Sequence, residues 1–120
     1  MNKKSMKYLE HDIRPWGEYI VIESSEDFKI KKIIVLPGQR LSYQYHNGRS
    51  ETWVIIQGKA KVTIDGIEHT HHKGDTIIIP KKAKHRIENL SKVNLVFIEI
   101  QTGDYFDEDD IIRIQDDYNR

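Results

Sequence analysis

Four side chains in two separate stretches of the chain have the donor types of a metal site. The first stretch, residues 38–58, contains Gln44, His46 and Glu51, and the second, residues 74–89, contains His85. Imidazole, carboxylate and amide oxygen suit zinc, manganese, iron, cobalt or nickel. Four protein ligands in an expanded shell leave positions for water or substrate, as in a catalytic site. The sequence therefore predicts a catalytic divalent-metal centre, and zinc is the ion we expect first.

The spacing of these residues predicts how strands would position them. Gln44 and His46 are two residues apart, so a strand places both side chains on one face. Asn47-Gly48 offers a turn, and we expect a hairpin there that returns Glu51 to the same face. His85 follows a loop and would begin a later strand. In a jelly roll the inward faces of such strands converge on one interior.

The rest of the chain predicts an all-β protein. Its apolar runs are short, rich in Ile and Val, and separated by Gly, Pro, Asn and Asp. Asp65-Gly66 between two alternating runs is a strong hairpin signal. Many short strands with no long helical pattern indicate a β-sandwich or barrel. The expected strands cover residues 30–36, 52–56, 60–64, 76–79, 86–87 and 94–100.

The two ends of the chain differ from the middle. Residues 1–13 are interpreted as a frayed or partner-seeking arm in front of a single domain, residues 14–120. One helical turn is expected at residues 107–110, because acidic residues suit a helix N-terminus. The acidic run could instead be a divalent-cation cluster, but a solvated turn is favoured because charge runs usually face water.

Composition excludes several classes of function. A chain of 120 residues is long enough for one domain with a core of its own. Lys plus Arg and Asp plus Glu number 19 each, which gives no support for binding nucleic acid or an acidic membrane. The absence of cysteine excludes thiol catalysis, zinc fingers and disulfides. With no signal sequence or membrane-spanning stretch visible, we expect a cytoplasmic protein.

The two stretches resemble the two motifs of the cupin superfamily. Gln44 stands at the usual first histidine position, and Lys82 stands where glycine is frequent. The resemblance implies a cupin-type double-stranded β-helix, that is, a jelly-roll barrel. The matching positions are Gly38, Gln44, His46, Glu51 and Gly58 in the first motif, and Gly74, Pro80, His85 and Asn89 in the second.

A longer resemblance points to one family within the cupins. Four segments are similar to the C-terminal domain of type II mannose-6-phosphate isomerase, which also carries Gln at the position of Gln44. They are RPWGEY (14–19), LPGQRLSYQYHNGRSETWVIIQGKAKV (36–62), IPKKAKHRIEN (79–89) and the tail from residue 97. In that family the domain is commonly fused behind a mannose-1-phosphate guanylyltransferase domain. The chain shows no Gly-rich pyrophosphorylase motif, so nucleotide-sugar synthesis is not implied.

The resemblance implies a function, partners and a ligand set. The function is metal-dependent interconversion of mannose 6-phosphate and fructose 6-phosphate through an enediolate. The partners are the sugar-phosphate substrate, a second copy in a homodimer, and a separate mannose-1-phosphate guanylyltransferase. The implied metal ligands are Gln44, His46, Glu51 and His85.

The sequence leaves the phosphate-binding and catalytic roles open. Arg40, Arg49 and Arg14 are candidates for binding the substrate phosphate, because guanidinium binds phosphate in a bidentate manner. Arg40 and Arg49 flank the ligand strand and are favoured as the pair, and pairing of either one with a surface carboxylate is the equal alternative. Glu51, Lys31 and His85 are each possible general bases, and Glu51, Lys31 and Arg49 are the candidate catalytic residues. Two other functions are considered: a non-catalytic cupin that binds a sugar phosphate or metabolite, and a cupin dioxygenase.

Aromatic residues and a second histidine group are assigned to structure. Trp16, Tyr19 and Trp53 are expected to pack in the core, and Tyr43 and Tyr45 to face away from the site by strand parity. His69 and His71 share a strand face and could bind a metal. An open edge hairpin is favoured for them, since the sequence places no acidic ligand beside them.

Overall fold

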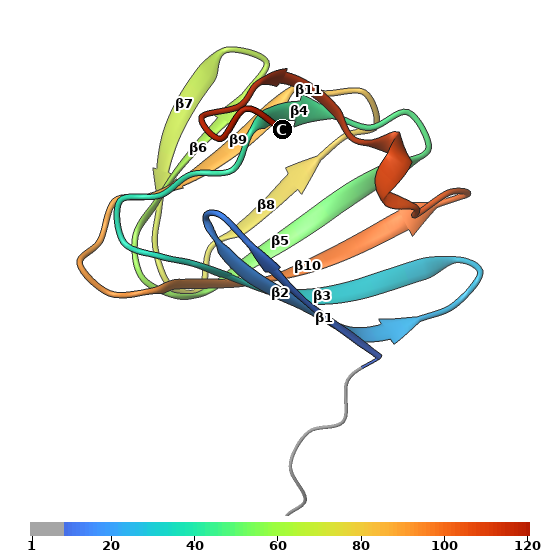
Figure 1. Cartoon of the computed structure of the whole chain (residues 1–120), viewed down its shortest axis with the longest axis horizontal. Coiled ribbons are helices and arrows are strands. Elements are labelled where there is room, and N and C mark those ends of the chain that lie inside the picture. Colours follow the sequence, from blue (N-terminus) through green and yellow to red (C-terminus); the bar gives the residue numbers. More distant parts are fainter. Residues whose placement is uncertain (1–8) are drawn as a thin grey trace, which may run out of the picture.

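The computed structural model describes residues 9–120, which form two antiparallel β-sheets that face each other (Figure 1). The predicted all-β class is confirmed. The six-stranded sheet has the order β1 (Glu10–Arg14), β2 (Gly17–Ser24), β3 (Phe28–Val35), β10 (Leu95–Gly103), β5 (Arg49–Gln57) and β8 (Thr76–Ile79). The five-stranded sheet has the order β11 (Ile112–Gln115), β4 (Tyr43–Tyr45), β9 (His85–Asn89), β6 (Ala60–Ile64) and β7 (Ile67–His71).

The core lies between the two sheets and follows from strand alternation. In β5 and β10 every second residue is buried, because successive side chains of a strand point to opposite faces. Trp53 and Phe97 pack with ring centroids 5.1 Å apart at the centre of this core. Each fully buried side chain of this kind contributes about 1.5–3 kcal/mol. The core confirms that Trp16, Tyr19 and Trp53 are packing residues.

The predicted Asp65-Gly66 hairpin joins β6 to β7. Asp65 and Gly66 have φ angles of 47° and 83°, and Ile64 pairs with Ile67 across the turn. Two positive φ angles in succession match the twist of the flanking strands, and Asp-Gly adopts them readily.

The turn at Asn47-Gly48 is not the hairpin that the spacing suggested. Strands β4 and β5 belong to different sheets, so the chain crosses at this turn from one wall of the barrel to the other. The Asp110 carboxylate holds the turn by accepting the N–H groups of Asn47 and Gly48 at 3.0 and 2.8 Å. Glu51 therefore approaches His46 across the barrel interior and not along a single sheet.

The chain ends contain three strands that were absent from the sequence prediction. Residues 1–8 of the expected arm lie outside the described residues. Residues 10–13 belong to β1, which pairs with β2, so the expected domain boundary at residue 14 falls inside a strand. The expected helical turn is present as the 3₁₀ helix η1 (Glu108–Asp110), followed by β11. In the described part of the chain, no helix has the length and apolar character needed to cross a membrane.

Candidate metal centre and its cavity

Three of the four predicted metal ligands meet in the barrel interior. One ligand atom from each of His46, Glu51 and His85 lies within 4.8 Å of the others. Their exposed fractions are 3%, 2% and 2%. His46 follows β4, Glu51 lies on β5 and His85 begins β9, so both sheets contribute.

Backbone carbonyls set the orientation of both imidazoles. His46 Nδ1 lies 3.2 Å from the Asp110 carbonyl oxygen, and His85 Nδ1 lies 2.9 Å from that of Ala83. A carbonyl only accepts, so each Nδ1 carries the proton and each Nε2 presents a lone pair. These Nε2 atoms lie 3.2 and 3.9 Å from the Glu51 carboxylate. His85 Nε2 is buried without a hydrogen-bond partner, as expected of an atom that awaits a cation.

Arg49 and Trp53 hold the carboxylate of Glu51 in place. Trp53 Nε1 donates to Glu51 Oε1 at 2.9 Å, and Arg49 Nε donates to Oε2 at 3.0 Å. A terminal nitrogen of Arg49 also lies 3.3 Å from His46 Nε2. The buried guanidinium therefore neutralises the same carboxylate and faces the same lone pair that a metal ion would use.

The protonation states suit metal binding. Burial alone would raise the pKa of Glu51, but the charge of the neighbouring Arg49 guanidinium holds that pKa well below its usual value. Burial lowers the pKa of His85 against the opposing charge of Glu51, and the charge of Arg49 adds to the lowering. An ionised carboxylate and a neutral imidazole are the forms in which these groups bind metals.

Gln44 belongs to the same site. It pairs with His85 in the register of β4 and β9, and it lines the cavity together with His46 and Glu51. Tyr43 faces the opposite side of β4, as strand parity predicted, and its hydroxyl accepts the N–H of Gly66 at 3.0 Å.

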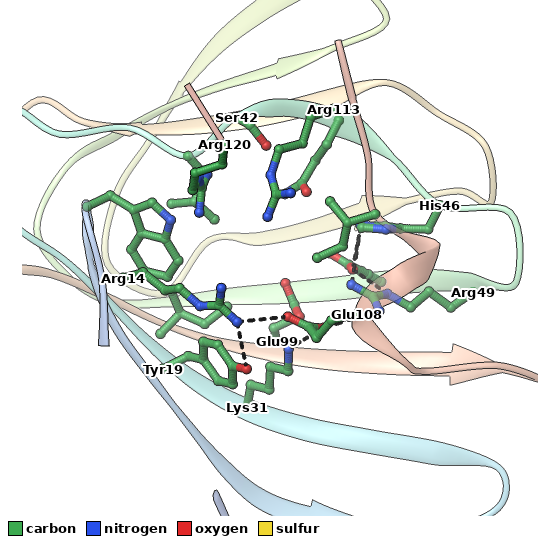
Figure 2. A pocket seen from close by; sticks show the side chains of 16 residues that line it. Arg14, Tyr19, Lys31, Ser42, His46, Arg49, Glu99, Glu108, Arg113 and Arg120 are labelled. Atoms are coloured by element: carbon green, nitrogen blue, oxygen red, sulfur yellow. Dashed lines mark hydrogen bonds and ion pairs between the residues drawn. The ribbon is translucent and has the colours of Figure 1, made fainter. Parts of the chain in front are cut away.

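The cavity above the ligands has a volume of about 50 Å³ and walls rich in charge (Figure 2). Glu108 of η1 lies between cationic groups, 3.2 Å from Lys31, 3.7 Å from Arg14 and 4.0 Å from Arg49. The charges of Lys31 and Arg49 lower the pKa of Glu108 against the opposing effect of burial. These cationic groups thus form an anion-binding site, which the Glu108 carboxylate occupies.

Arg113 and Arg120 reach the cavity from the opposite wall (Figure 2), and the sequence reasoning missed both. Burial and the nearby charge of Arg120 lower the pKa of Arg113. The alternation in IIRIQ (111–115) puts Arg113 on the other face of the strand from Ile112 and Ile114. This pattern could have identified Arg113 from the sequence.

Arg40 lies elsewhere. It makes a two-pronged ion pair with Asp117, at 2.7 and 2.9 Å, and does not line this cavity. Of the three arginines predicted to bind phosphate, the structure brings Arg14 and Arg49 to the site and leaves Arg40 outside it.

Glu99 is a buried carboxyl group of the site that the sequence reasoning did not select. It points inward from β10 and lines the cavity. Burial and the neighbouring charge of Glu51 raise the pKa of Glu99 to about 8. Gln101 Nε2 donates to its Oε2 at 2.7 Å. The sequence does contain a signal for Glu99, because it is a charged residue at an inward-facing position of an alternating apolar strand.

The second histidine group lies on the edge strand β7, as expected. The rings of His69 and His71 are 6.3 Å apart. The sequence-based reason for discounting them was wrong in one respect, because Asp75 Oδ2 lies 3.3 Å from His71 Nδ1. Among residues 9–120, the only cluster of three or more potential ligands is His46, Glu51 and His85.

Two facing antiparallel sheets around a buried His/Glu cluster define the chain as a cupin. Solved structures of this fold include the capsular polysaccharide assembling protein CapF from Staphylococcus aureus, with a TM-score of 0.79 at 21% identity. That match covers 92% of this chain and 35% of CapF. A variant oxalate decarboxylase from B. subtilis has a TM-score of 0.77 at 20% identity, over 88% of this chain and 30% of that one. These similarities concern the fold alone.

The family within the cupins follows from sequence comparison. Residues 1–116 match the profile described as "Mannose-6-phosphate isomerase C-terminal", and the chain belongs to this family. It is 44% identical over 107 residues to a mannose-1-phosphate guanylyltransferase of Escherichia coli K12. It is 41% identical over 107 residues to the alginate biosynthesis protein AlgA of Pseudomonas aeruginosa. Each match covers 89% of this chain but only 22% of the relative, so the chain spans about a fifth of their length.

Proposed function

We propose that the domain is a metal-dependent sugar-phosphate isomerase that interconverts mannose 6-phosphate and fructose 6-phosphate. The observation that carries this proposal is the convergence of His46, Glu51 and His85 at the base of a cavity with cationic walls. The family to which the chain belongs supports the choice of substrate.

A divalent ion would be held by Gln44, His46, Glu51 and His85. When bound, it would polarise the sugar carbonyl and stabilise the negative charge of the enediolate. The tautomers fixed by Asp110 and Ala83 and the ionised state of Glu51 fit this role, as described above.

The cationic groups would bind the phosphate. Arg14 and Arg113 approach the cavity from opposite walls, and guanidinium groups bind phosphate in a bidentate manner. Arg120 is engaged by Asp116 at 3.0 and 3.1 Å, so its contribution is mainly its charge. A cavity of about 50 Å³ has room for about three waters and is too small for a hexose phosphate.

Substrate entry therefore requires Glu108 to leave its position. Only the Glu108 side chain would have to move, because Asp110 of the same helix η1 must keep its bonds to His46, Asn47 and Gly48. The phosphate would then replace the Glu108 carboxylate beside Lys31 and Arg14. One anion exchanges for another, and the buried cations are not left unpaired.

Assigning Glu51 and His85 as metal ligands leaves fewer candidates for the general base. Glu51 and His85 direct their free electron pairs into the ligand cluster, which removes them from the list of free bases. Lys31 stands over the ring of Tyr19, with its Nζ 4.2 Å from the centroid, and reaches the cavity. We assign to Lys31 and Arg49 the stabilisation of negative charge on the substrate as the proton moves between C1 and C2.

The test is a coupled assay for fructose 6-phosphate with purified, zinc-loaded protein. We expect turnover that is lost on chelation and returns with the metal, and a raised KM for Arg113→Gln with kcat little changed. Arg40→Gln is the matched control, since Arg40 lies outside the cavity. Binding of mannose 6-phosphate without turnover would overturn the isomerase assignment.

The second candidate function is a non-catalytic sugar-phosphate binder. The dense cationic lining of the cavity favours it, because that lining binds an anion whether or not chemistry follows. Calorimetric binding without product in the coupled assay is its signature. Oxygen consumption by an iron-loaded sample would instead indicate the dioxygenase alternative.

The relatives suggest where the product is used. They are named as mannose-1-phosphate guanylyltransferases and match this chain over only a fifth of their length. We propose that this domain operates alongside a separate guanylyltransferase, and co-purification of the two proteins would test this partnership.

A further inference from the structure

The outer face of the five-stranded sheet carries a polar groove that is separate from the metal cavity. Its volume is about 260 Å³, against about 50 Å³ for the metal cavity. Strand alternation separates the two sites. On β4, Gln44 lines the metal cavity and its neighbour Tyr43 lines the groove. On β9, His85 joins the ligand cluster and its neighbour Arg86 lines the groove.

Arg86 is a buried cation in the floor of this groove. Across the strands, Thr63 of β6 lies between Arg86 of β9 and Glu68 of β7. Arg86 is 7% exposed and donates only to uncharged acceptors, the Leu41 carbonyl at 2.9 Å and two oxygens of Gln115 at 2.8 and 3.1 Å. A guanidinium has five N–H donors, so two of them have no acceptor among residues 9–120, and no carboxylate there forms an ion pair with Arg86. Because a buried charge without an ionic partner is costly, this position favours a bound anion.

The next row of the groove brings carboxylates beside a second cation. Glu88 of β9 lies between Arg40 and Lys61 of β6. Lys61 Nζ lies 3.5 Å from the Glu88 carboxylate and 3.6 Å from that of Glu68. These pairs are partly exposed, and such pairs contribute at most about 1 kcal/mol, so a ligand could replace them at little cost. Arg40 is held by Asp117 and adds its charge from the rim.

We propose that the groove binds a small hydroxylated phosphate ester, the chemical class that includes hexose phosphates. The phosphate would lie on Arg86 and Lys61, since a guanidinium binds phosphate in a bidentate manner and an ammonium adds a point charge. The hydroxyl groups would donate to Glu68 and Glu88, because carboxylates accept hydrogen bonds.

The mixed lining of the groove selects this class over simpler ligands. A bare inorganic anion would satisfy the cations but would offer few donors to the two carboxylates. A neutral sugar would satisfy the carboxylates but would leave Arg86 without an anion. Only a ligand with both an anionic head and several hydroxyl groups fits both rows.

The test is an NMR titration of the full chain, in which the backbone amides of Thr63, Arg86 and Glu88 report on the groove. The probes are mannose 6-phosphate, inorganic phosphate and mannose. We expect saturable shifts with mannose 6-phosphate, binding of inorganic phosphate that is at least ~10-fold weaker, and no saturable shift with mannose. The amides of His46 and Arg49 report separately on the metal cavity, so failure of the isomerase proposal would leave the groove result readable.

Thr63→Glu is the principal variant, because it places a carboxylate between Arg86 and Glu68 and fills the anion position from within the chain. We expect it to raise the dissociation constant of the groove at least ~10-fold. Thr76→Glu is the matched control, since it adds the same side chain at an exposed position of β8 in the other sheet and should leave binding unchanged. Circular dichroism verifies that each variant is folded. If Thr63→Glu does not fold, Lys61→Gln serves as the second variant and should also weaken binding.

Three results would overturn the proposal. One is the absence of saturable shifts at the groove amides with mannose 6-phosphate. Another is binding that survives both Thr63→Glu and Lys61→Gln. The third is equal affinity for inorganic phosphate and mannose 6-phosphate, which would exclude recognition of a phosphate ester.

Discussion

In the metal-free protein, the ion pair between Arg49 and the predicted metal ligand Glu51 should stabilise the fold. The two side chains are 3% and 1% exposed, and Arg49 Nε lies 3.0 Å from Glu51 Oε2. Glu51→Gln leaves the Arg49 charge buried without its main partner. Breaking a buried pair in this way costs about 3–5 kcal/mol. We expect the free energy of unfolding to fall by that amount in the presence of a chelator.

A double-mutant cycle separates this effect from metal binding. Arg49→Met combined with Glu51→Gln removes both charges and replaces the guanidinium by an apolar side chain. The double variant should recover most of the lost stability, with a coupling energy of about 2 kcal/mol or more. It should not recover zinc binding, because the carboxylate ligand is still absent.

The pH dependence gives a second signature of Glu51. Its folded-state pKa is held well below 4.5, so the carboxylate stabilises the fold above pH 4.5. That contribution is lost as the pH falls through the folded-state pKa. The deficit of Glu51→Gln should therefore be largest near neutral pH and shrink in acid.

Urea unfolding followed by tryptophan fluorescence measures both effects, since Trp53 contacts Glu51 directly. A loss of under 1 kcal/mol for Glu51→Gln at neutral pH would refute the reasoning. A double variant no more stable than Glu51→Gln alone would refute it equally.

Three further predictions concern neighbouring residues. Glu99→Gln should stabilise the metal-free protein. A carboxyl whose pKa is raised to about 8 in the folded state lowers the free energy of unfolding by on the order of 1.4 kcal/mol per pH unit between pH 4.5 and 8. Its advantage in urea unfolding should thus be larger at pH 9 than at pH 6. Glu108→Gln should tighten inorganic phosphate binding in calorimetry, because Lys31 loses its internal carboxylate; unchanged affinity would contradict this. His71→Ala should leave the zinc stoichiometry of dialysed protein unchanged.

The sequence predicted the middle of the fold better than its ends. Alternation over residues 60–64 and 95–100 and the Asp65-Gly66 turn each identified a strand or hairpin that the structure contains. The strands β2 and β11 were missed although β2 contains the apolar run 19–22 and β11 alternates Ile with polar residues, and β1 was missed because its residues, EHDIR, are mostly charged. Such strands form because tertiary pairing overrides weak local preference.

Type and spacing predicted the three residues that cluster in the barrel, His46, Glu51 and His85, but not the path of the chain that joins them. The turn at Asn47-Gly48 was read as a hairpin, and only the sheet assignment shows that it crosses the barrel. Local sequence does not specify whether a turn reverses within a sheet or passes to the other one. The convergence of His46 and Glu51 survives this correction, since both face the same interior.

The charge environment could not be predicted from local sequence. Arg113 and Glu108 reach the cavity from the C-terminal segment, far along the chain from the ligands. The sequence ranked Arg40 with Arg49 because both flank the ligand strand. Asp117 pairs with Arg40 on the surface, which is a contact between distant positions that no pattern indicates.

The most direct test of the metal centre is equilibrium dialysis of zinc against the unmodified chain and His85→Ala. His85 Nε2 makes no hydrogen bond within residues 9–120, so removing this side chain should weaken metal binding more than the fold. We predict one zinc ion per unmodified chain and none bound tightly by the folded His85→Ala variant. Equal zinc binding by both proteins, or none by the unmodified chain, would contradict the metal centre.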